Sequence, residues 1–318
     1  MQTPVRSMDA VPYEVLAVVG PTASGKSAVA DLVAAALGSE VVSADAMQVY
    51  RGMDIGTAKT PVAERLVPLR CVDLVDPGEA YSVALYATAA HDAIDAVCAA
   101  GRIPVVCGGT GLYVRAAVEA MDFPAGEQCD NPVRRRYEEM AERLGPDRLH
   151  GLLAERDPQS AELIHPNNVR RVVRAFELLE QGTSYAIEHQ TLHQRVDRRP
   201  TLHIGLRLPR EVLYARINAR VDAMVQEGLV DEVRALVEHG FASTLTARQA
   251  IGYKEILDVF DGACTLDEAV ERIKQATRRY AKRQMTWFKA DGRIHWIDAD
   301  GRPSEAIACE VIDLLGVS

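Results

Sequence analysis

Residues 20–27 read Gly20-Pro21-Thr22-Ala23-Ser24-Gly25-Lys26-Ser27 and fit the pattern G-x-x-x-x-G-K-[ST] of a phosphate-binding loop in full. The short apolar run Val15–Val19 precedes the loop, and an alanine-rich helical pattern at 26–37 follows it. In such a loop, glycines let the backbone wrap a phosphate, and the helix N-terminus adds positive potential. Lys26 brings a mobile charge, and the Ser27 hydroxyl is a ligand for Mg²⁺. We expect all eight residues to bind a diphosphate or polyphosphate, although the loop alone does not prove a nucleotide such as ATP.

Short apolar runs alternate with helical patterns on both sides of this loop. Further strands are expected at 41–43, 103–107, 202–208 and 294–297. Helices are expected at 83–100, from 111 to 120, and at 210–227, 229–239, 248–260, 266–289 and 303–315. This alternation is typical of βαβ units in a parallel sheet. The sequence therefore predicts an α/β fold with a P-loop NTPase-like parallel sheet core.

The character of the chain changes near Asp122. Residues 122–200 contain no convincing strand and are rich in Arg and Glu, with prolines that punctuate the helical stretches. We expect a helical insertion domain here. The predicted organisation is therefore a first part of the core at 1–121, the insertion at 122–200, and the completion of the core with C-terminal helices at 201–318.

Composition narrows the class of protein. The chain has 318 residues, 48% of them hydrophobic and 25% charged, which is ordinary for a globular protein. Six cysteines without a Cys-x-x-Cys pair argue against a zinc motif and favour a reducing, cytoplasmic compartment. No run approaches the ~18 apolar residues of a membrane helix, so we expect no membrane partner.

Charge is unevenly distributed along the chain. The net charge of −9 argues against a general nucleic-acid binder. However, residues 193–220 hold seven Arg against two acids, and residues 270–293 hold eight Lys and Arg against two acids. Such local basic segments suit contacts to a phosphate backbone, although most basic runs are merely solvated helix faces.

Two polar segments follow predicted strands, where open α/β sheets bind their ligands. Asp45 follows the strand at 41–43 and could hold Mg²⁺ or accept a proton; the alternative is a helix N-cap. Gly108-Gly109-Thr110-Gly111 follows the strand at 103–107 and offers N–H groups and a hydroxyl, or is only a tight turn. A kinase or ATPase would show a metal-binding carboxylate there. The segment 71–76 could supply one, but its flanks are weak.

Taken together, five segments of the sequence resemble those of the bacterial tRNA isopentenyltransferase family. They are the phosphate loop, Asp45-Ala-Met-Gln-Val-Tyr-Arg-Gly-Met-Asp-Ile-Gly-Thr-Ala-Lys59, Gly108-Gly-Thr-Gly-Leu-Tyr113, Ile164-His-Pro-Asn-Asn-Val-Arg-Arg171 and Lys282-Arg-Gln-Met-Thr-Trp-Phe288. The similarity runs from about Leu16 to Asp298. The second and fifth segments are far more specific than the phosphate loop.

The resemblance implies transfer of a dimethylallyl group from its diphosphate to N6 of the adenosine 3′ of the anticodon. By position, Gly20–Ser27 would hold the diphosphate, with Mg²⁺ at Ser27. Asp45 matches the family's general base, Thr110 a threonine beside the reacting centre, and Arg220 an arginine that clamps the diphosphate. The implied partners are dimethylallyl diphosphate and the anticodon stem-loop of tRNA, bound by a monomer.

The resemblance also implies a set of residues that contact tRNA. They are Asp45, Ala46, Met47, Gln48, Thr110, Arg134, Asn168, Val169, Arg170, Arg171, Val172, Gln249, Gly252, Tyr253, Lys254, Lys282, Arg283, Gln284 and Trp287. Arg134 is less securely aligned than the others. The chain departs from the family at Ala46, where serine is common, and at Lys254, where arginine is common and would offer a bidentate fork.

Two other functions compete with this one. A small-molecule kinase would use ATP at the same loop and would need a metal carboxylate after a buried strand. A non-catalytic tRNA-binding protein would carry a vestigial loop, which the intact Lys26, Ser27 and Asp45 argue against. Four aromatics could stack on a base, although an aromatic of this kind is more often a core or rim residue: Tyr50, Tyr113, Tyr253 and Trp287.

Overall fold

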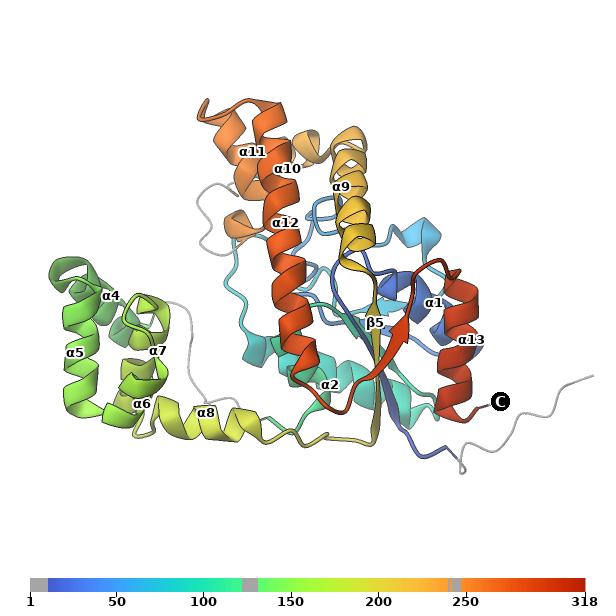
Figure 1. The fold of residues 1–318 in the computed structure, drawn as a ribbon, viewed down its shortest axis with the longest axis horizontal. Coiled ribbons are helices and arrows are strands. Elements are labelled where there is room, and N and C mark those ends of the chain that lie inside the picture. Colours follow the sequence, from blue (N-terminus) through green and yellow to red (C-terminus); the bar gives the residue numbers. More distant parts are fainter. Residues whose placement is uncertain (1–10, 122–130, 240, 242–246, 318) are drawn as a thin grey trace, which may run out of the picture. The chain divides into compact units, whose positions relative to one another are not determined.

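The computed structural model describes residues 11–121, 131–239, 241 and 247–317. The chain divides into two compact units. One, here called the α/β unit, is formed by Met1–Glu119 together with Asp197–Ser318, and the other, the helical unit, by Ala120–Val196. The sequence predicted 122–200 for the insertion. Figure 1 shows the helical unit in green to yellow.

The α/β unit is built on a six-stranded sheet in which every pair of neighbours is parallel, as predicted. The strand order is β3-β2-β4-β1-β5-β6. The strands are β1 (Val15–Val19), β2 (Val41–Ser43), β3 (Leu69–Arg70), β4 (Val105–Gly108), β5 (Thr201–Arg207) and β6 (His295–Asp298). Only the edge strand β3 was not predicted. Because β1 lies between β4 and β5, the phosphate loop that follows β1 emerges at the centre of the sheet.

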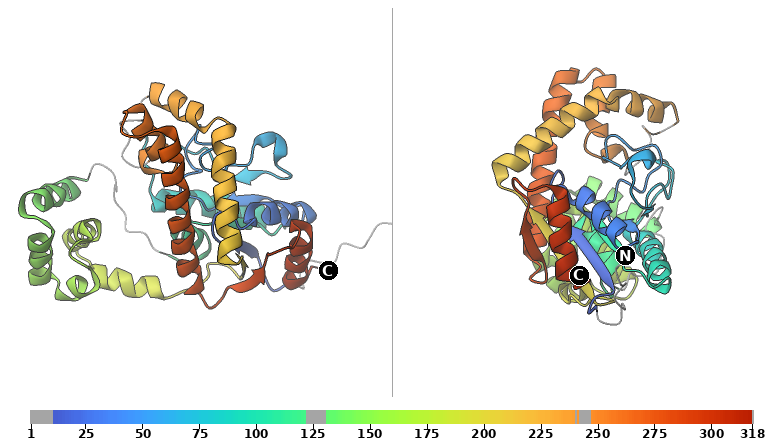
Figure 2. Two further views of the ribbon diagram at one scale, coloured as in Figure 1. Left: turned by 45° about the horizontal axis from the view of Figure 1, so that its top comes forward. Right: turned by 90° about the vertical axis from the view of Figure 1, so that its right-hand side faces the viewer.

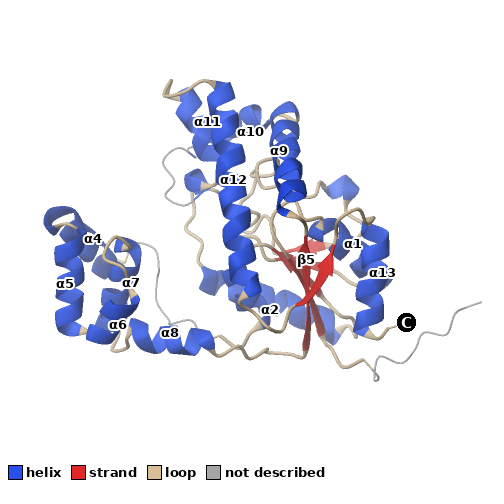
Figure 3. Cartoon of the chain, in the orientation of Figure 1, coloured by secondary structure: helices blue, strands red, loops and turns tan. Residues whose placement is uncertain are grey.

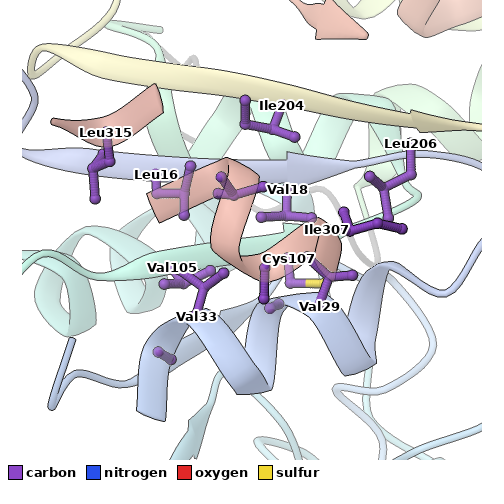
Figure 4. Packing of buried hydrophobic residues seen from close by; sticks show 14 of the residues in the cluster. Leu16, Val18, Val29, Val33, Val105, Cys107, Ile204, Leu206, Ile307 and Leu315 are labelled. Carbon is purple, nitrogen blue, oxygen red and sulfur yellow. The ribbon is translucent and has the colours of Figure 1, made fainter. Parts of the chain in front are cut away.

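Helices cover both faces of this sheet, so its central strands are buried on both sides. Leu16 and Val18 of β1 pack into an apolar cluster with α1 (Lys26–Ala36) and α13 (Ser304–Leu315), as Figure 4 shows. The alternate residue Ala17 is also fully buried. Helices α2 (Val83–Ala99) and α3 (Gly111–Val118) pack against each other beside the same strands.

The C-terminal half of the α/β unit adds a group of helices. These are α9 (Arg210–Gln226), α10 (Leu229–Glu238), α11 (Tyr253–Phe260) and α12 (Leu266–Lys289). A short 3₁₀ helix at Ala247–Gln249 precedes α11, and another at Val62–Glu64 lies between β2 and β3. Helix α12 packs against α9 and α11, and Figures 1 and 2 show α9 and α12 side by side. Thr265 and Glu268 form a capping box that fixes the start of α12.

The helical unit consists of α4 (Pro132–Leu144), α5 (Pro146–Arg156), α6 (Pro158–Leu163), α7 (Val169–Glu180) and α8 (Tyr185–His193). Its described residues form helices and connecting loops only (Figure 3). The prolines noted in the sequence begin α4, α5 and α6, where a missing N–H costs nothing. Its core includes Tyr137 stacked on Phe176, with ring centroids 4.2 Å apart.

A cluster of charges ties together the two places where the chain leaves and re-enters the α/β unit. Arg293 pairs with Glu119, with Asp197 at 2.7 Å and with Asp291 at 2.7 Å. Glu119 and Asp197 also form a β-bridge, so the two crossings are held side by side. None of the helices in the described part of the chain combines the length and apolarity that crossing a bilayer requires.

Candidate active site at the carboxyl ends of the strands

The phosphate loop joins β1 to α1, as its sequence pattern predicts. Gly25 is the N-cap of α1 and has φ +91°, a conformation that a side chain disfavours. Ser24 is buried, and its hydroxyl has no hydrogen-bond partner among the described residues. Because a buried polar group normally has a partner, this hydroxyl fits an anionic ligand held in the loop.

Two cations lie close together at the phosphate loop: Lys26 of the loop itself and Arg220 of α9. Burial lowers the pKa of Lys26, and the nearby Arg220 of α9 lowers it further, while Asp45 acts to raise it. Cys107 would also raise it if ionised, but burial raises the pKa of that thiol to about 11, so it is neutral at pH 7. Desolvation also lowers the pKa of Arg220, and the charge of Glu227 acts to raise it. Two adjacent desolvated cations favour a multiply charged anion between them.

Asp45 and Thr110 meet beside the phosphate loop because β2 and β4 are neighbours in the sheet. The backbone N–H of Ala46 donates to Thr110 Oγ1 at 3.2 Å, and the N–H of Met47 donates to Asp45 Oδ1 at 2.9 Å. Asp45 therefore caps a turn rather than a helix. Its Oδ2 accepts no hydrogen bond from the described residues, which leaves that oxygen available to a ligand.

Helix α12 contributes a residue that sequence reasoning missed. Tyr280 Oη lies 3.4 Å from Thr110 Oγ1, and burial raises the pKa of Tyr280 to about 12. Tyr280, Gln284 and Trp287 are spaced by four and three residues, so they share one face of α12. The indole of Trp287 lies on Gly111, where a Cβ would come within 2.1 Å of its Cδ1. The sequence shows this spacing, but it does not show that this face of α12 packs against the turn at Thr110 and Gly111.

Helix α10 binds the loop at 54–59 through the side chain of Glu232. Glu232 accepts hydrogen bonds from the N–H groups of Asp54, Ile55 and Gly56 at 2.7–3.2 Å, and from the Tyr253 hydroxyl at 2.6 Å. The carbonyl of Thr57 then accepts from Gln48 Nε2 at 3.2 Å. Gln48 in turn accepts from the Ser43 hydroxyl at 2.7 Å. Glu232 was not predicted, since a lone glutamate on a helix carries no motif.

The residues predicted to contact tRNA differ in their exposure to solvent. Of the aromatic candidates, Trp287 is 40% exposed, whereas Tyr50, Tyr113 and Tyr253 are buried. Arg134 is paired with Glu177 at 2.7 Å. Partly exposed are Ala46, Met47, Gln48, Asn168 and Val169, and exposed are Arg170, Arg171, Gln249, Lys254, Lys282, Arg283 and Trp287. In contrast, four of the predicted contacts are buried residues: Val172, Gly252, Tyr253 and Gln284.

Magnesium would have few protein ligands here. Among the described residues, no group of three or more His, Cys, Asp or Glu could hold a metal ion. Mg²⁺ commonly keeps several waters and binds through substrate phosphates with one or two protein oxygens. Ser27, an exposed residue at the first turn of α1, carries a hydroxyl that fits that kind of site.

The fold and site define a protein of the P-loop-type α/β class, with a complete phosphate-loop pattern after β1 and a carboxylate, Asp45, after β2. The family model described as IPP transferase matches residues 48–291. A tRNA dimethylallyltransferase of Kineococcus radiotolerans is 47% identical over 312 residues, covering 95% of this chain and 96% of the relative. The chain therefore belongs to the IPP transferase family, a family of prenyltransferases, and the resemblance is confirmed.

The solved structures that resemble this chain support the same family assignment. A tRNA isopentenylpyrophosphate transferase of Bacillus halodurans superposes with a TM-score of 0.70 at 40% identity, covering 96% of each chain. A eukaryotic dimethylallyltransferase, solved acting on tRNA, superposes with a TM-score of 0.78 at 29% identity. It covers 95% of this chain and 79% of that one.

Proposed function

We propose that this chain transfers the dimethylallyl group of dimethylallyl diphosphate to N6 of the adenosine 3′ of the anticodon in tRNA, releasing diphosphate. The observation that carries the proposal is one arrangement. The anion site formed by the phosphate loop, Lys26 and Arg220 lies beside the hydrogen-bonded turn that joins Asp45 to Thr110.

The chemistry follows from these groups. The N6 lone pair forms a bond to C1 of the dimethylallyl group as the bond from C1 to the diphosphate oxygen breaks. The electron pair of the broken bond leaves with diphosphate, where Lys26, Arg220 and the loop N–H groups stabilise the growing negative charge. The adenine amine is a weak nucleophile, so loss of its proton to Asp45 Oδ2 assists bond formation.

Thr110 and Ser27 complete the proposed site. Thr110 Oγ1, held by the Ala46 N–H, lies between the carboxylate and α12 and orients the reacting amine. Ser27, with diphosphate oxygens and water, would hold Mg²⁺, which supplies further charge neutralisation of the leaving group. ATP is not required by any step.

We assign tRNA binding to exposed cations on both units. Arg170 and Arg171 lie exposed at the start of α7, and Lys282 and Arg283 lie exposed on α12. Positive side chains at such places suit the phosphate backbone of the anticodon stem-loop. The target adenine must leave its stack to react, and Trp287 is the exposed aromatic best placed to contact it. We further propose that the protein acts in the cytoplasm as a monomer.

A kinase is disfavoured by the end of β4. This strand continues into Gly109-Thr110-Gly111, which provides no carboxylate for a metal. The two functions are separated by supplying unmodified tRNA with radiolabelled dimethylallyl diphosphate or with γ-labelled ATP in parallel. We expect label to enter tRNA only from dimethylallyl diphosphate, and not with Lys26→Ala. Transfer of phosphate from ATP, or no transfer from dimethylallyl diphosphate, would overturn the proposal.

A further inference from the structure

Gln284 joins the two loops that carry the proposed chemistry. Its Oε1 accepts a hydrogen bond from the N–H of Thr22, in the phosphate loop, at 2.9 Å. Its Nε2 donates to the carbonyl of Gly109, in the turn after β4, at 2.9 Å. The residue is 4% exposed; its bond to Gly109 is buried and its bond to Thr22 is partly buried.

The fit around this amide is close. A Cβ on Gly109 would lie 2.3 Å from Gln284 Nε2, so the absence of a side chain at 109 lets the amide reach the backbone. Thr22 and Gly109 belong to different loops, which follow the neighbouring strands β1 and β4. A primary amide carries an acceptor oxygen and a donor NH₂ group at a fixed separation. It therefore fixes the distance between these loops.

That distance matters for the reaction. One loop holds the leaving diphosphate, and the other carries Thr110, which is bonded to the turn of Asp45. We propose that Gln284 is a positioning residue that aligns the diphosphate with the Asp45–Thr110 pair, and that it does not contact tRNA. The inference rests on the proposed function, because it assigns the two loops to the leaving group and the acceptor.

The neighbours of Gln284 on α12 have a different environment. Lys282 and Arg283 are exposed, while Gln284 faces the loops. One short stretch of sequence therefore combines two roles, tRNA binding by the two cations and loop alignment by the amide. The motif alone could not separate them, because both roles occur in consecutive residues.

The first experiment uses Gln284→Met, which keeps the length of the side chain but removes both hydrogen bonds. Gln275→Met is the matched control, since Gln275 is exposed on the same helix. Single-turnover rates are measured with saturating tRNA and dimethylallyl diphosphate, and tRNA affinity by filter binding. We expect the single-turnover rate of Gln284→Met to fall by about 10²-fold, as for a misplacement of about 1 Å. The affinity for tRNA should stay within about two-fold, a change of under 0.5 kcal/mol.

The second experiment uses Gln284→Glu and pH. A protonated glutamic acid can accept from Thr22 and donate to Gly109, whereas a carboxylate can only accept. The ratio of its single-turnover rate to that of the wild type should therefore rise as pH falls. Gln275→Glu should show a constant ratio. The pH dependence of Gln284→Glu still tests the proposal if Gln284→Met proves too unstable to assay.

Two results would overturn the proposal. One is a loss of tRNA affinity with a normal single-turnover rate in Gln284→Met, which would make Gln284 a tRNA contact. The other is a pH-independent rate ratio for Gln284→Glu. Failure of the proposed function itself would be seen differently, as an absence of label transfer by the wild-type protein.

Discussion

The two units use the residues of their motifs in opposite ways. In the α/β unit, the loops that carry Lys26, Asp45 and Thr110 are joined by hydrogen bonds through Gln284 and the Ala46 N–H. In the helical unit, Arg170 and Arg171 of α7 are exposed to solvent, whereas Ile164 and Val172 on either side of them lie in the apolar core. Chemistry needs reacting groups at fixed separations. Contact with a phosphate backbone needs mainly positive charge near it.

The comparison predicts that substitutions in the α/β unit reduce rate, whereas those in the helical unit reduce affinity. The largest effect is expected for Asp45→Asn, which keeps the shape and hydrogen bond of the turn but cannot accept the proton. Loss of a general base costs about 10²–10⁴ in rate. Single-turnover measurement on the bound complex should show this loss while tRNA affinity changes little. A normal rate with collapsed tRNA affinity would make Asp45 a positioning residue.

Lys26→Ala removes the mobile cation of the phosphate loop. Losing one stabiliser of transition-state charge costs about 10²–10³ in rate, and the KM for dimethylallyl diphosphate should rise as well. The fold should survive, because the pKa of Lys26 is lowered by burial and its charge is a cost to the unliganded protein. Steady-state kinetics and thermal melting check both points. Full activity in a folded Lys26→Ala protein would refute the assignment of the loop.

The same pKa shift gives a pH prediction. Since the pKa of Lys26 is below its ordinary value of 10.5, the lysine loses its proton at a lower pH than a free lysine does. Affinity for dimethylallyl diphosphate should therefore weaken on the alkaline side, below the ordinary lysine range. Binding measured across this range in wild type and Lys26→Ala should differ in slope. Parallel curves would show that Lys26 does not titrate in the binding equilibrium.

Salt dependence sharpens the comparison between the units. If exposed cations neutralise tRNA phosphates, log affinity falls linearly with log salt at about 0.7–0.9 per phosphate. Replacing Arg170 and Arg171 by Ala, or Lys282 and Arg283 by Ala, should flatten that slope by up to about two. The single-turnover rate at saturating tRNA should stay near wild type in the helical-unit pair. An unchanged slope in a folded variant would remove that pair from the tRNA surface.

The smallest effect is expected at Tyr253. Tyr253→Phe removes one hydrogen bond to the Glu232 carboxylate, worth about 1.5–3 kcal/mol for a charged partner. Glu232 keeps its three backbone donors, so the loss of stability should fall at the low end of that range. Denaturant unfolding measures the loss, and Tyr214→Phe, on a partly buried tyrosine of α9, is a control. A tRNA contact through the hydroxyl would instead lower affinity without changing stability.

The sequence predicted most of the α/β architecture because its signals are local. Apolar runs marked β1, β2, β4, β5 and β6, and a complete loop pattern marked the phosphate site. The strand β3 was missed because it is only two residues long and lies at the edge of the sheet. A segment that short has no periodicity of its own.

The supporting residues of the site could not be predicted in the same way. Glu232, Tyr280 and the double hydrogen bond of Gln284 depend on which helix packs against which loop. Such contacts link residues up to 262 positions apart, as for Thr22 and Gln284. The resemblance named Gln284 and Tyr253 as tRNA contacts because they belong to contiguous motifs, and the structure places both side chains in the interior.

The central claim is that the groups at the ends of β1, β2 and β4 transfer a dimethylallyl group to an adenine amine. The most direct measurement is mass spectrometry of nucleosides from an unmodified tRNA incubated with this protein and dimethylallyl diphosphate. The account predicts N6-dimethylallyl adenosine in the fragment immediately 3′ of the anticodon, formed by the wild type and strongly reduced with Asp45→Asn. Unmodified adenosine at that position with the folded wild-type protein, or equal product from Asp45→Asn, would contradict it.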